Sequence, residues 1–162
     1  MASSLRSLVL LCGICGLLAG VSCQTIKGFC PKGYTRLNDR CLIFEHEPRT
    51  FADAERVCNI LGGNLVSIPN GVENAVIIEL IRDGSGDDFK NTWNGYHDTL
   101  LEGNFVWSDG TAEDFTDFAP TQPDDTGNED CVEIRADDEQ WNDVDCTNEN
   151  SFVCAIDVLK KH

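Results

Sequence analysis

The chain has 162 residues, which is enough for one domain of ordinary size and a short appendage. Its 12 basic and 28 acidic side chains give a formal net charge of −16, and this charge repels nucleic-acid phosphates and anionic membranes but attracts cations. Nucleic acid is therefore excluded as a partner. Three Trp and a clear apolar pattern favour a packed core over a disordered acidic chain.

Residues 1–23 are typical of a secretory signal peptide. Arg6 supplies the positive charge, residues 8–19 form an apolar run of 12, and Val21 and Cys23 are small residues before the cleavage point. The run is shorter than the roughly 20 residues that a membrane-spanning helix needs, so we expect no membrane insertion. The mature protein, residues 24–162, is therefore expected to be secreted and extracellular.

The cysteine count agrees with cleavage after Cys23. Of nine cysteines, six then remain: Cys30, Cys41, Cys58, Cys131, Cys146 and Cys154. An even set in a secreted chain predicts three disulfides, but spacing alone does not choose among the pairings. Cleavage after Gly20 would instead keep Cys23 as an odd thiol, available for a bridge between two copies of the chain.

The first part of the mature chain predicts a closed hairpin and an amphipathic helix. Cys30 and Cys41 flank a turn-rich segment that leads into an apolar strand, residues 41–44. Thr50 is a suitable N-cap for a helix that ends at two consecutive glycines. Apolar residues at helical spacing define its buried face: Phe51, Ala54, Cys58 and Leu61.

The later elements change from helix to strand near residue 92. We expect a short strand at residues 64–68 and a second helix from residues 69–71 to about residue 84. Beyond them, short apolar runs between turn residues predict strands at residues 92–98, 104–110, 131–136 and 150–156. Residues 108–130 form a long segment without regular pattern, and such loops are usually functional or disordered.

Residues 122–143 concentrate oxygen-bearing side chains. The candidate ligands are carboxylates and amides: Gln122, Asp124, Asp125, Glu129, Asp130, Asn142 and Asp143. Hard oxygen ligands in this number, without His, favour calcium over zinc, which prefers nitrogen and sulfur. The alternative for such a cluster, taken alone, is a solvated acidic turn.

The sequence offers no arrangement typical of an enzyme. The adjacent acids at residues 137–139 do not face one another across a cleft, and no nucleophile stands beside a His. We therefore interpret His46, His97 and His162 as surface or packing residues, and we predict no catalytic activity.

The chain resembles the C-type lectin-like domain through four motifs in the order of that family. They are WNGYHDTLLEGNFVWSDG (93–110), QPD (122–124), EDC (129–131) and WND (141–143), followed by Cys154. The resemblance covers a core of residues 30–156. It implies an α+β fold in which two helices flank antiparallel sheets and a long loop holds calcium. It also implies the disulfides Cys30–Cys41, Cys58–Cys154 and Cys131–Cys146, the first of which marks the long form with an N-terminal hairpin.

The same resemblance implies two calcium sites. The primary ligands would be Gln122, Asp124, Glu129, Asn142 and Asp143, with a cis peptide bond before Pro123 and Trp141 as a core aromatic beneath them. The accessory ligands would be Asp98, Glu102, Asp125 and Asp130, and all four positions match. Because these carboxylates repel one another without a cation, we expect calcium to order their loops.

In this family, the bound calcium accepts two neighbouring sugar hydroxyls, and the QPD order goes with galactose and N-acetylgalactosamine. The resemblance thus implies a lectin for glycans of cell surfaces or glycoproteins. The sugar contacts would be Gln122, Asp124, Glu129 and Asn142. Strong galactose binders usually carry an aromatic residue shortly after QPD, and residues 125–128 contain none. We therefore expect millimolar binding, about −4 kcal/mol, which would gain avidity in a homo-oligomer.

Two roles without a sugar are compatible with the same fold. Some fish type II antifreeze proteins resemble this QPD site and depend on calcium, although they carry additional disulfides and their ice-binding faces are usually lightly charged. A mineral-associated lectin-like protein would bind many calcium ions through its acidic surface.

Overall fold

The computed structural model describes residues 28–86 and 88–160. The expected signal peptide, residues 1–23, lies outside the described residues. Within the described ranges, no helix combines the length and the apolar character that a membrane span requires.

Most of the strands belong to one sheet of eight, in the order β2–β3–β9–β5–β7–β8, with β4 paired to β9 and β6 to β5. The strands are β1 (Gly28–Phe29), β2 (Thr35–Leu37), β3 (Arg40–Arg49), β4 (Asn64–Leu65), β5 (Thr92–His97), β6 (Val106–Trp107), β7 (Cys131–Ile134), β8 (Trp141–Val144), β9 (Asn150–Asp157) and β10 (Leu159–Lys160). Strands β1 and β10 form a separate ribbon. The α+β class is confirmed, but β5 and β9 pair in parallel, so the large sheet is mixed rather than purely antiparallel.

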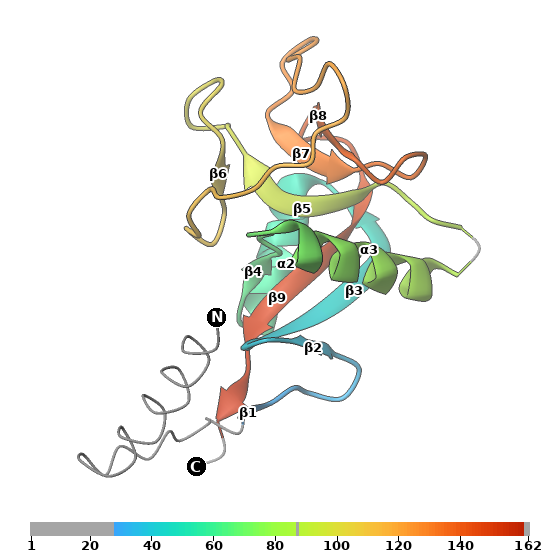
Figure 1. Cartoon of the computed structure of the whole chain (residues 1–162). Coiled ribbons are helices and arrows are strands. Elements are labelled where there is room, and N and C mark those ends of the chain that lie inside the picture. Colours follow the sequence, from blue (N-terminus) through green and yellow to red (C-terminus); the bar gives the residue numbers. More distant parts are fainter. Residues whose placement is uncertain (1–27, 87, 161–162) are drawn as a thin grey trace, which may run out of the picture.

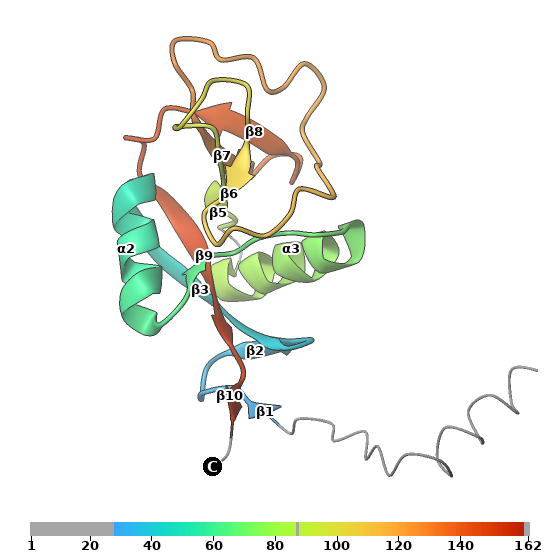
Figure 2. The same cartoon turned by 90° about the vertical axis from the view of Figure 1, so that its left-hand side faces the viewer.

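The two helices, α2 (Phe51–Leu61) and α3 (Gly71–Ser85), lie on either side of the long β3–β9 pair (Figure 2). Thr50 caps α2 by accepting a hydrogen bond from the Asp53 N–H, and Gly62 ends it with a left-handed backbone, φ 97°. Leu61 is 38% exposed, so the buried face of α2 ends one turn earlier than expected. Because caps act over a few residues, the ends of this helix follow from local sequence.

Several strands differ from the sequence prediction in length. Only Asn64 and Leu65 of the expected strand at residues 64–68 pair as β4, and residues 106–107 alone form β6. Strand β3 extends through Arg49, five residues beyond the predicted apolar run. Strand β8 was not predicted, because its sequence, Trp-Asn-Asp-Val, lacks an apolar run and it is defined by pairing with β7.

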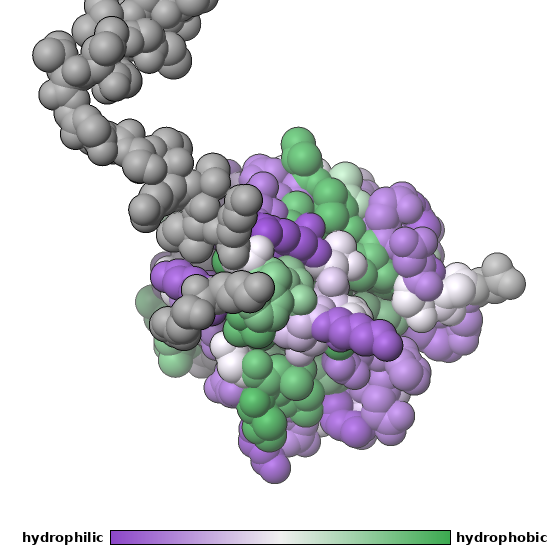
Figure 3. Space-filling model, turned by 90° about the horizontal axis from the view of Figure 1, so that it is seen from below, coloured by the Kyte–Doolittle hydropathy of each residue, from purple (hydrophilic) through white to green (hydrophobic). Residues whose placement is uncertain are grey.

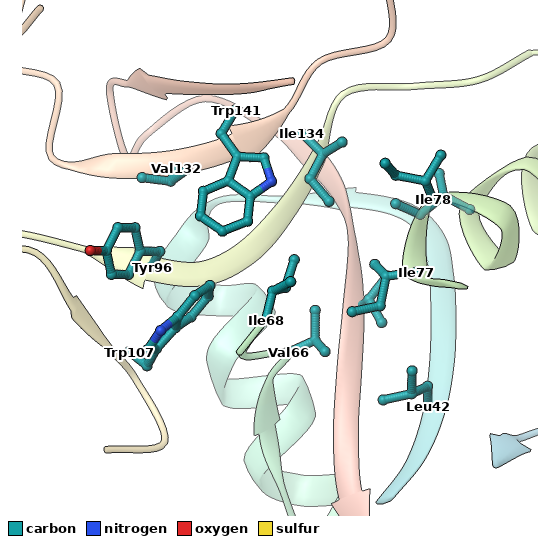
Figure 4. Close-up of a cluster of buried hydrophobic side chains, with 12 residues drawn as sticks. Leu42, Val66, Ile68, Ile77, Ile78, Tyr96, Trp107, Val132, Ile134 and Trp141 are labelled. Atoms are coloured by element: carbon teal, nitrogen blue, oxygen red, sulfur yellow. The ribbon is translucent and has the colours of Figure 1, made fainter. Parts of the chain in front are cut away.

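The core is divided into two clusters of buried side chains. The larger cluster joins α3 to the aromatic residues Tyr96, Trp107 and Trp141, and Figure 4 shows the Trp141 indole pointing into it from β8. The smaller cluster packs α2 against Trp93 and Phe152. This cluster contains the disulfide Cys58–Cys154 and the Cys131 end of Cys131–Cys146, and Cys30–Cys41 closes the β2–β3 end. These are the pairings that the resemblance implied.

The molecule has two unlike ends (Figures 1 and 2). Strands β1 and β10 lie at one end, where the partly exposed Phe29 and Leu159 are paired, and the face seen in Figure 3 carries both hydrophobic and hydrophilic patches. The opposite end carries the turn at residues 98–104 and the long loop at residues 108–130. The oxygen-rich motifs of the sequence therefore meet at one end of the sheet.

Candidate functional site

Two groups of carboxylates lie at the loop end of the sheet. Within each group, one ligand atom per residue lies within 4.8 Å of the others. The QPD cluster consists of Asp124, Glu129 and Asp143, and the turn cluster consists of Asp98, Glu102 and Asp130. The structure thus brings six of the seven predicted acidic calcium ligands into two groups of three, and residues of one group are up to 32 positions apart in the sequence.

Backbone N–H groups fix the geometry of the QPD cluster. The Asp143 carboxylate is 1% exposed and accepts hydrogen bonds from the N–H groups of Asp124, at 3.0 and 3.1 Å, and Asp125, at 2.9 Å. The Thr126 N–H donates to Asp124 at 3.0 Å and to Glu129 at 3.1 Å. The loop tip therefore folds around its own carboxylates, which face one another.

The QPD segment itself has the features that the resemblance implied. The peptide bond between Gln122 and Pro123 is cis. The Gln122 amide Nε2 donates to the Asp124 carboxylate at 3.2 Å, so the two side chains lie side by side. Further along, Asp125, Gly127 and Asn128 have left-handed backbone angles, φ 47°, 96° and 77°. These conformations allow the short tip to turn sharply.

A buried acceptor without a partner lies in or beside each cluster. Among the described residues, neither the Gln122 Oε1 atom nor the Asp98 Oδ1 atom has a hydrogen-bond partner. Buried polar oxygens are nearly always paired, and an unpaired one needs an explanation such as an ion or a water. An all-oxygen donor set of carboxylates and one amide suits calcium, so the residues present fit this metal.

Burial, neighbouring like charges and hydrogen bonds shift the pKa values of carboxylates in both clusters. Burial, followed by the neighbouring Asp143 and Asp124 carboxylates, raises the pKa of Glu129. Burial and the carboxylates of Asp98, Asp125 and Asp130 raise the pKa of Glu102. Hydrogen bonds from Thr126 lower the pKa of Asp124, which therefore holds its negative charge more firmly. A divalent cation would relieve this repulsion.

The turn cluster is tied to the loop through main-chain contacts. The Asp98 N–H donates to the Asp130 carbonyl at 3.1 Å, and the Asp98 carboxylate accepts from the Gly103 N–H at 2.7 Å. Asp125, the fourth predicted accessory ligand, accepts instead from the Glu129 N–H at 2.8 Å. Its charge contributes to the raised pKa of Glu102 in the turn cluster.

Asn142 faces away from the carboxylates that it was predicted to join. It pairs with Glu133 in the β7–β8 ladder, and the two residues line the same face of these strands. Asp143, one residue further along β8, points to the opposite face and reaches the loop tip. Strand alternation therefore separates two side chains that are adjacent in the motif.

A polar support beneath the loop was not predicted. The Trp141 indole N–H donates to Asn74 of α3 at 3.2 Å, and the Asn74 amide donates to Asp117 at 2.8 Å. Asn74 is 4% exposed and follows Glu73 in the buried stripe of α3, which continues with Ile77, Ile78 and Ile81. A polar residue at that spacing is the signal that would have identified it. Trp141 is fully buried, as expected for a core aromatic.

The sequence family agrees with this geometry. The model of the family described as "Lectin C-type domain" matches residues 47–156. The chain belongs to the C-type lectin domain family. Domains of this family are generally calcium-dependent, which agrees with the two carboxylate clusters.

Relatives within this family have different described activities. The chain is 35% identical to an alpha-N-acetylgalactosamine-specific lectin of Patiria pectinifera over 130 residues, 76% of this chain and 77% of the relative. It is 38% identical to the galactose-specific lectin nattectin of Thalassophryne nattereri over 127 residues, 78% of this chain and 79% of the relative. Herring type II antifreeze protein has a similar structure, with a TM-score of 0.73 and 32% identity over 80% of this chain and 99% of that protein.

Proposed function

We propose that this C-type lectin domain is a secreted, calcium-dependent lectin that binds terminal galactose or N-acetylgalactosamine. The observation that carries the proposal is the side-by-side arrangement of the Gln122 amide and the Asp124 carboxylate at the edge of the QPD cluster. The names of the two lectin relatives support the sugar class. Secretion rests on residues 1–23, and no residue arrangement favours an enzyme.

The proposed ligand sets follow the clusters. Gln122, Asp124, Glu129, Asn142 and Asp143 would hold the primary calcium, and Asp98, Glu102, Asp125 and Asp130 would hold an accessory one. Bound calcium supplies a positive charge that accepts sugar hydroxyl oxygens. The buried Gln122 Oε1 and Asp98 Oδ1 atoms, which lack partners among the described residues, support one metal at each cluster. Asn142 would need to turn from Glu133 to join its set.

Selectivity would come from the order of donor and acceptor. Each sugar hydroxyl can donate one hydrogen bond and accept others, and Gln122 offers an amide donor where Asp124 offers only acceptors. Tyr96 and Trp141 are 1% and 0% exposed, so neither is free to stack on a sugar. Binding to a single site is therefore expected to be weak, with avidity from assembly of several copies on a glycan-bearing surface.

The test is retention on galactose-agarose with calcium and elution by a chelator. The double variant Gln122→Glu, Asp124→Asn keeps oxygen ligands while exchanging donor and acceptor, so it should lose galactose and gain mannose. Binding of the natural protein that is indifferent to chelator, or an unchanged preference in the double variant, would contradict the proposal.

Ice binding is the second candidate, because a type II antifreeze protein has a similar structure. A surface that binds ice is usually flat and lightly charged, whereas Asp124, Asp125 and Glu129 crowd the loop tip. Thermal hysteresis without retention on galactose-agarose would favour the antifreeze role.

A further inference from the structure

The end of the molecule that carries β1 and β10 presents an open ribbon. These two strands pair with each other and with no other described strand, so the outer edge of each is unpaired. Phe29 and Leu159 lie opposite one another on the ribbon, and their side chains are 49% and 43% exposed. An open strand edge with exposed apolar side chains can pair with another chain.

An apolar hollow of about 340 Å³ adjoins the ribbon. It is formed by the end of α2, by the last residues of β9 and by β10. Four of its lining residues are apolar: Leu61, Ile156, Val158 and Leu159. Because Leu61 is 38% exposed, the apolar surface of the ribbon continues onto α2.

A charged hollow of about 230 Å³ lies beside the apolar one. Its lining combines two cations, two acids and one apolar residue: Arg36, Lys160, Asp39, Asp157 and Val158. Three of these residues also line the apolar hollow, so the two hollows adjoin. The Arg36 guanidinium donates to the Gly28 carbonyl at 2.5 Å, which holds it against β1. Figure 3 shows hydrophobic and hydrophilic surfaces side by side on this end.

The charges of this end are not neutralised within the described chain. Six of the nine described Lys and Arg side chains form salt bridges: Arg40, Arg49, Arg56, Arg82, Lys90 and Arg135. The other three, Lys32, Arg36 and Lys160, form none with a described carboxylate, and all three belong to the β1–β2 hairpin or to β10. Asp39 and Asp157 form none with a described cation, although they line the same hollow as Arg36 and Lys160.

A second copy of the chain fits both hollows. A twofold axis brings one surface against itself, so the two cations of one charged hollow can face the two acids of the other, and the reverse. The chain carries a formal net charge of −16, so two copies repel one another over most of their surface. In the charged hollow, by contrast, cations and acids are equal in number. Contact between the apolar surfaces would remove them from water.

We infer that the β1–β10 end is the interface of a twofold dimer of this protein. Each copy covers the exposed Phe29 and Leu159 of the other and matches its unpaired charges. The two carboxylate clusters lie at the opposite end of the molecule (Figure 1), so both copies keep them free and pointing away from the interface. The inference goes beyond the proposed function, because the dimer forms whatever ligand the clusters bind. If that ligand is a glycan, the dimer supplies two sites for avidity.

The test is sedimentation velocity of the mature chain, residues 24–162, which lacks Cys23 and cannot form a disulfide through it. The natural chain should shift from monomer to dimer as its concentration rises. Leu159→Glu places an acid on the ribbon and should raise the dissociation constant about tenfold or more, because each substitution acts twice at a twofold interface. The matched control Leu100→Glu, at an exposed leucine of the opposite end, should leave it unchanged. A chain that stays monomeric up to about 1 mM, or equal effects of the two variants, would overturn the interface.

Charge reversal tests the pairing across the axis. Lys160→Glu and Asp157→Lys should each weaken dimerisation, because like charges then face each other. An equimolar mixture of the two variants should dimerise again, because the acid introduced in one copy meets the lysine introduced in the other. A misfolded variant could not give this recovery. If either variant alone dimerises as well as the natural chain, or if the mixture stays monomeric, the interface is overturned.

The dimer and the proposed function can fail separately, because sedimentation is measured without any sugar. A monomeric natural chain that is retained on galactose-agarose with calcium would overturn the interface and leave the lectin. A dimer that is not retained would overturn the lectin and leave the interface.

Discussion

Calcium removal should open the tip of the long loop and leave its base in place. The base, residues 115–119, packs Phe115 and Phe118 against Trp141, with ring centroids 5.7 and 5.9 Å apart. Main-chain hydrogen bonds join Asp117 and Ala119 to Trp141 at 2.9 Å. The tip, residues 121–129, is held mainly by hydrogen bonds to the carboxylates of the QPD cluster. Only the tip therefore depends on charges that calcium would balance.

The size of the effect follows from mass action. Calcium at about 100 times its dissociation constant stabilises the closed tip by about 2.7 kcal/mol if the open tip does not bind it. Chelation should therefore raise the population of the open tip by about 100-fold. When opening and closing are fast, the rate of proteolysis rises in the same proportion.

A glutamate-specific protease provides the assay, because residues 108–130 contain two glutamates in different surroundings. Glu129 lies in the tip, whereas the exposed Glu113 precedes the anchored base. Mass spectrometry should show cleavage after Glu129 accelerated about 100-fold by chelator, and cleavage after Glu113 unchanged. Equal acceleration at both sites would show that the base also opens, and no acceleration at Glu129 would refute calcium as the clamp of the tip.

Four further predictions test the clusters and the frame. Asp143→Asn removes one carboxylate oxygen that accepts from the Asp124 and Asp125 N–H groups. Urea unfolding in chelator should show that this variant loses about 1–3 kcal/mol of unfolding free energy. The control variant Glu149→Gln, at an exposed position, should show no such loss. Asp98→Asn should abolish one class of calcium site in a calcium titration and spare retention on galactose-agarose. Gly63→Ala would place a Cβ 1.9 Å from the Ala155 carbonyl oxygen and should destabilise the fold by about 1–3 kcal/mol, measured in the same way. The rise in melting temperature caused by calcium should be smaller at about pH 5 than at about pH 7, because the raised pKa of Glu129 lets protons compete with the metal as pH falls.

The stability of the calcium-free protein and the additional stability that calcium gives should change in opposite directions with pH. Because the folded, calcium-free protein raises the pKa of Glu129, it binds that proton more tightly than the unfolded chain does. Its own stability should therefore fall as pH rises through this pKa. Calcium binding requires the deprotonated carboxylate, so its stabilising contribution should rise over the same interval. A calcium effect that is equal at both pH values would contradict this linkage.

Local signals account for the parts of the fold that the sequence predicts well. Thr50 and Gly62 determine the ends of α2 through contacts within a few residues, and the hairpin between Cys30 and Cys41 is similarly local. Strand β8 lacks such a signal, because its register comes from β7. The Asn74–Asp117 bond joins residues 43 apart in the sequence, and no local pattern identifies both partners.

The sequence likewise predicts some features of the candidate site and not others. The motifs identify which carboxylates cluster, because the resemblance carries over residue by residue, and Asp124, Glu129 and Asp143 do lie together. Burial and side-chain direction are not local properties. The side of β8 on which Asn142 lies, beside Glu133, depends on how β7 and β8 pair.

Alternation along β8 gives the three residues of the WND motif three different roles. Trp141 points into the core and is hydrogen-bonded to α3, so the strand has a fixed position beneath the loop. Asn142 points outward beside Glu133 of β7, and Asp143 points inward again and holds the loop tip through the N–H groups of Asp124 and Asp125. Because one rigid strand carries both Trp141 and Asp143, a metal bound by the tip would share its support with the core. A shift of β8 would therefore disturb the core and the QPD cluster together.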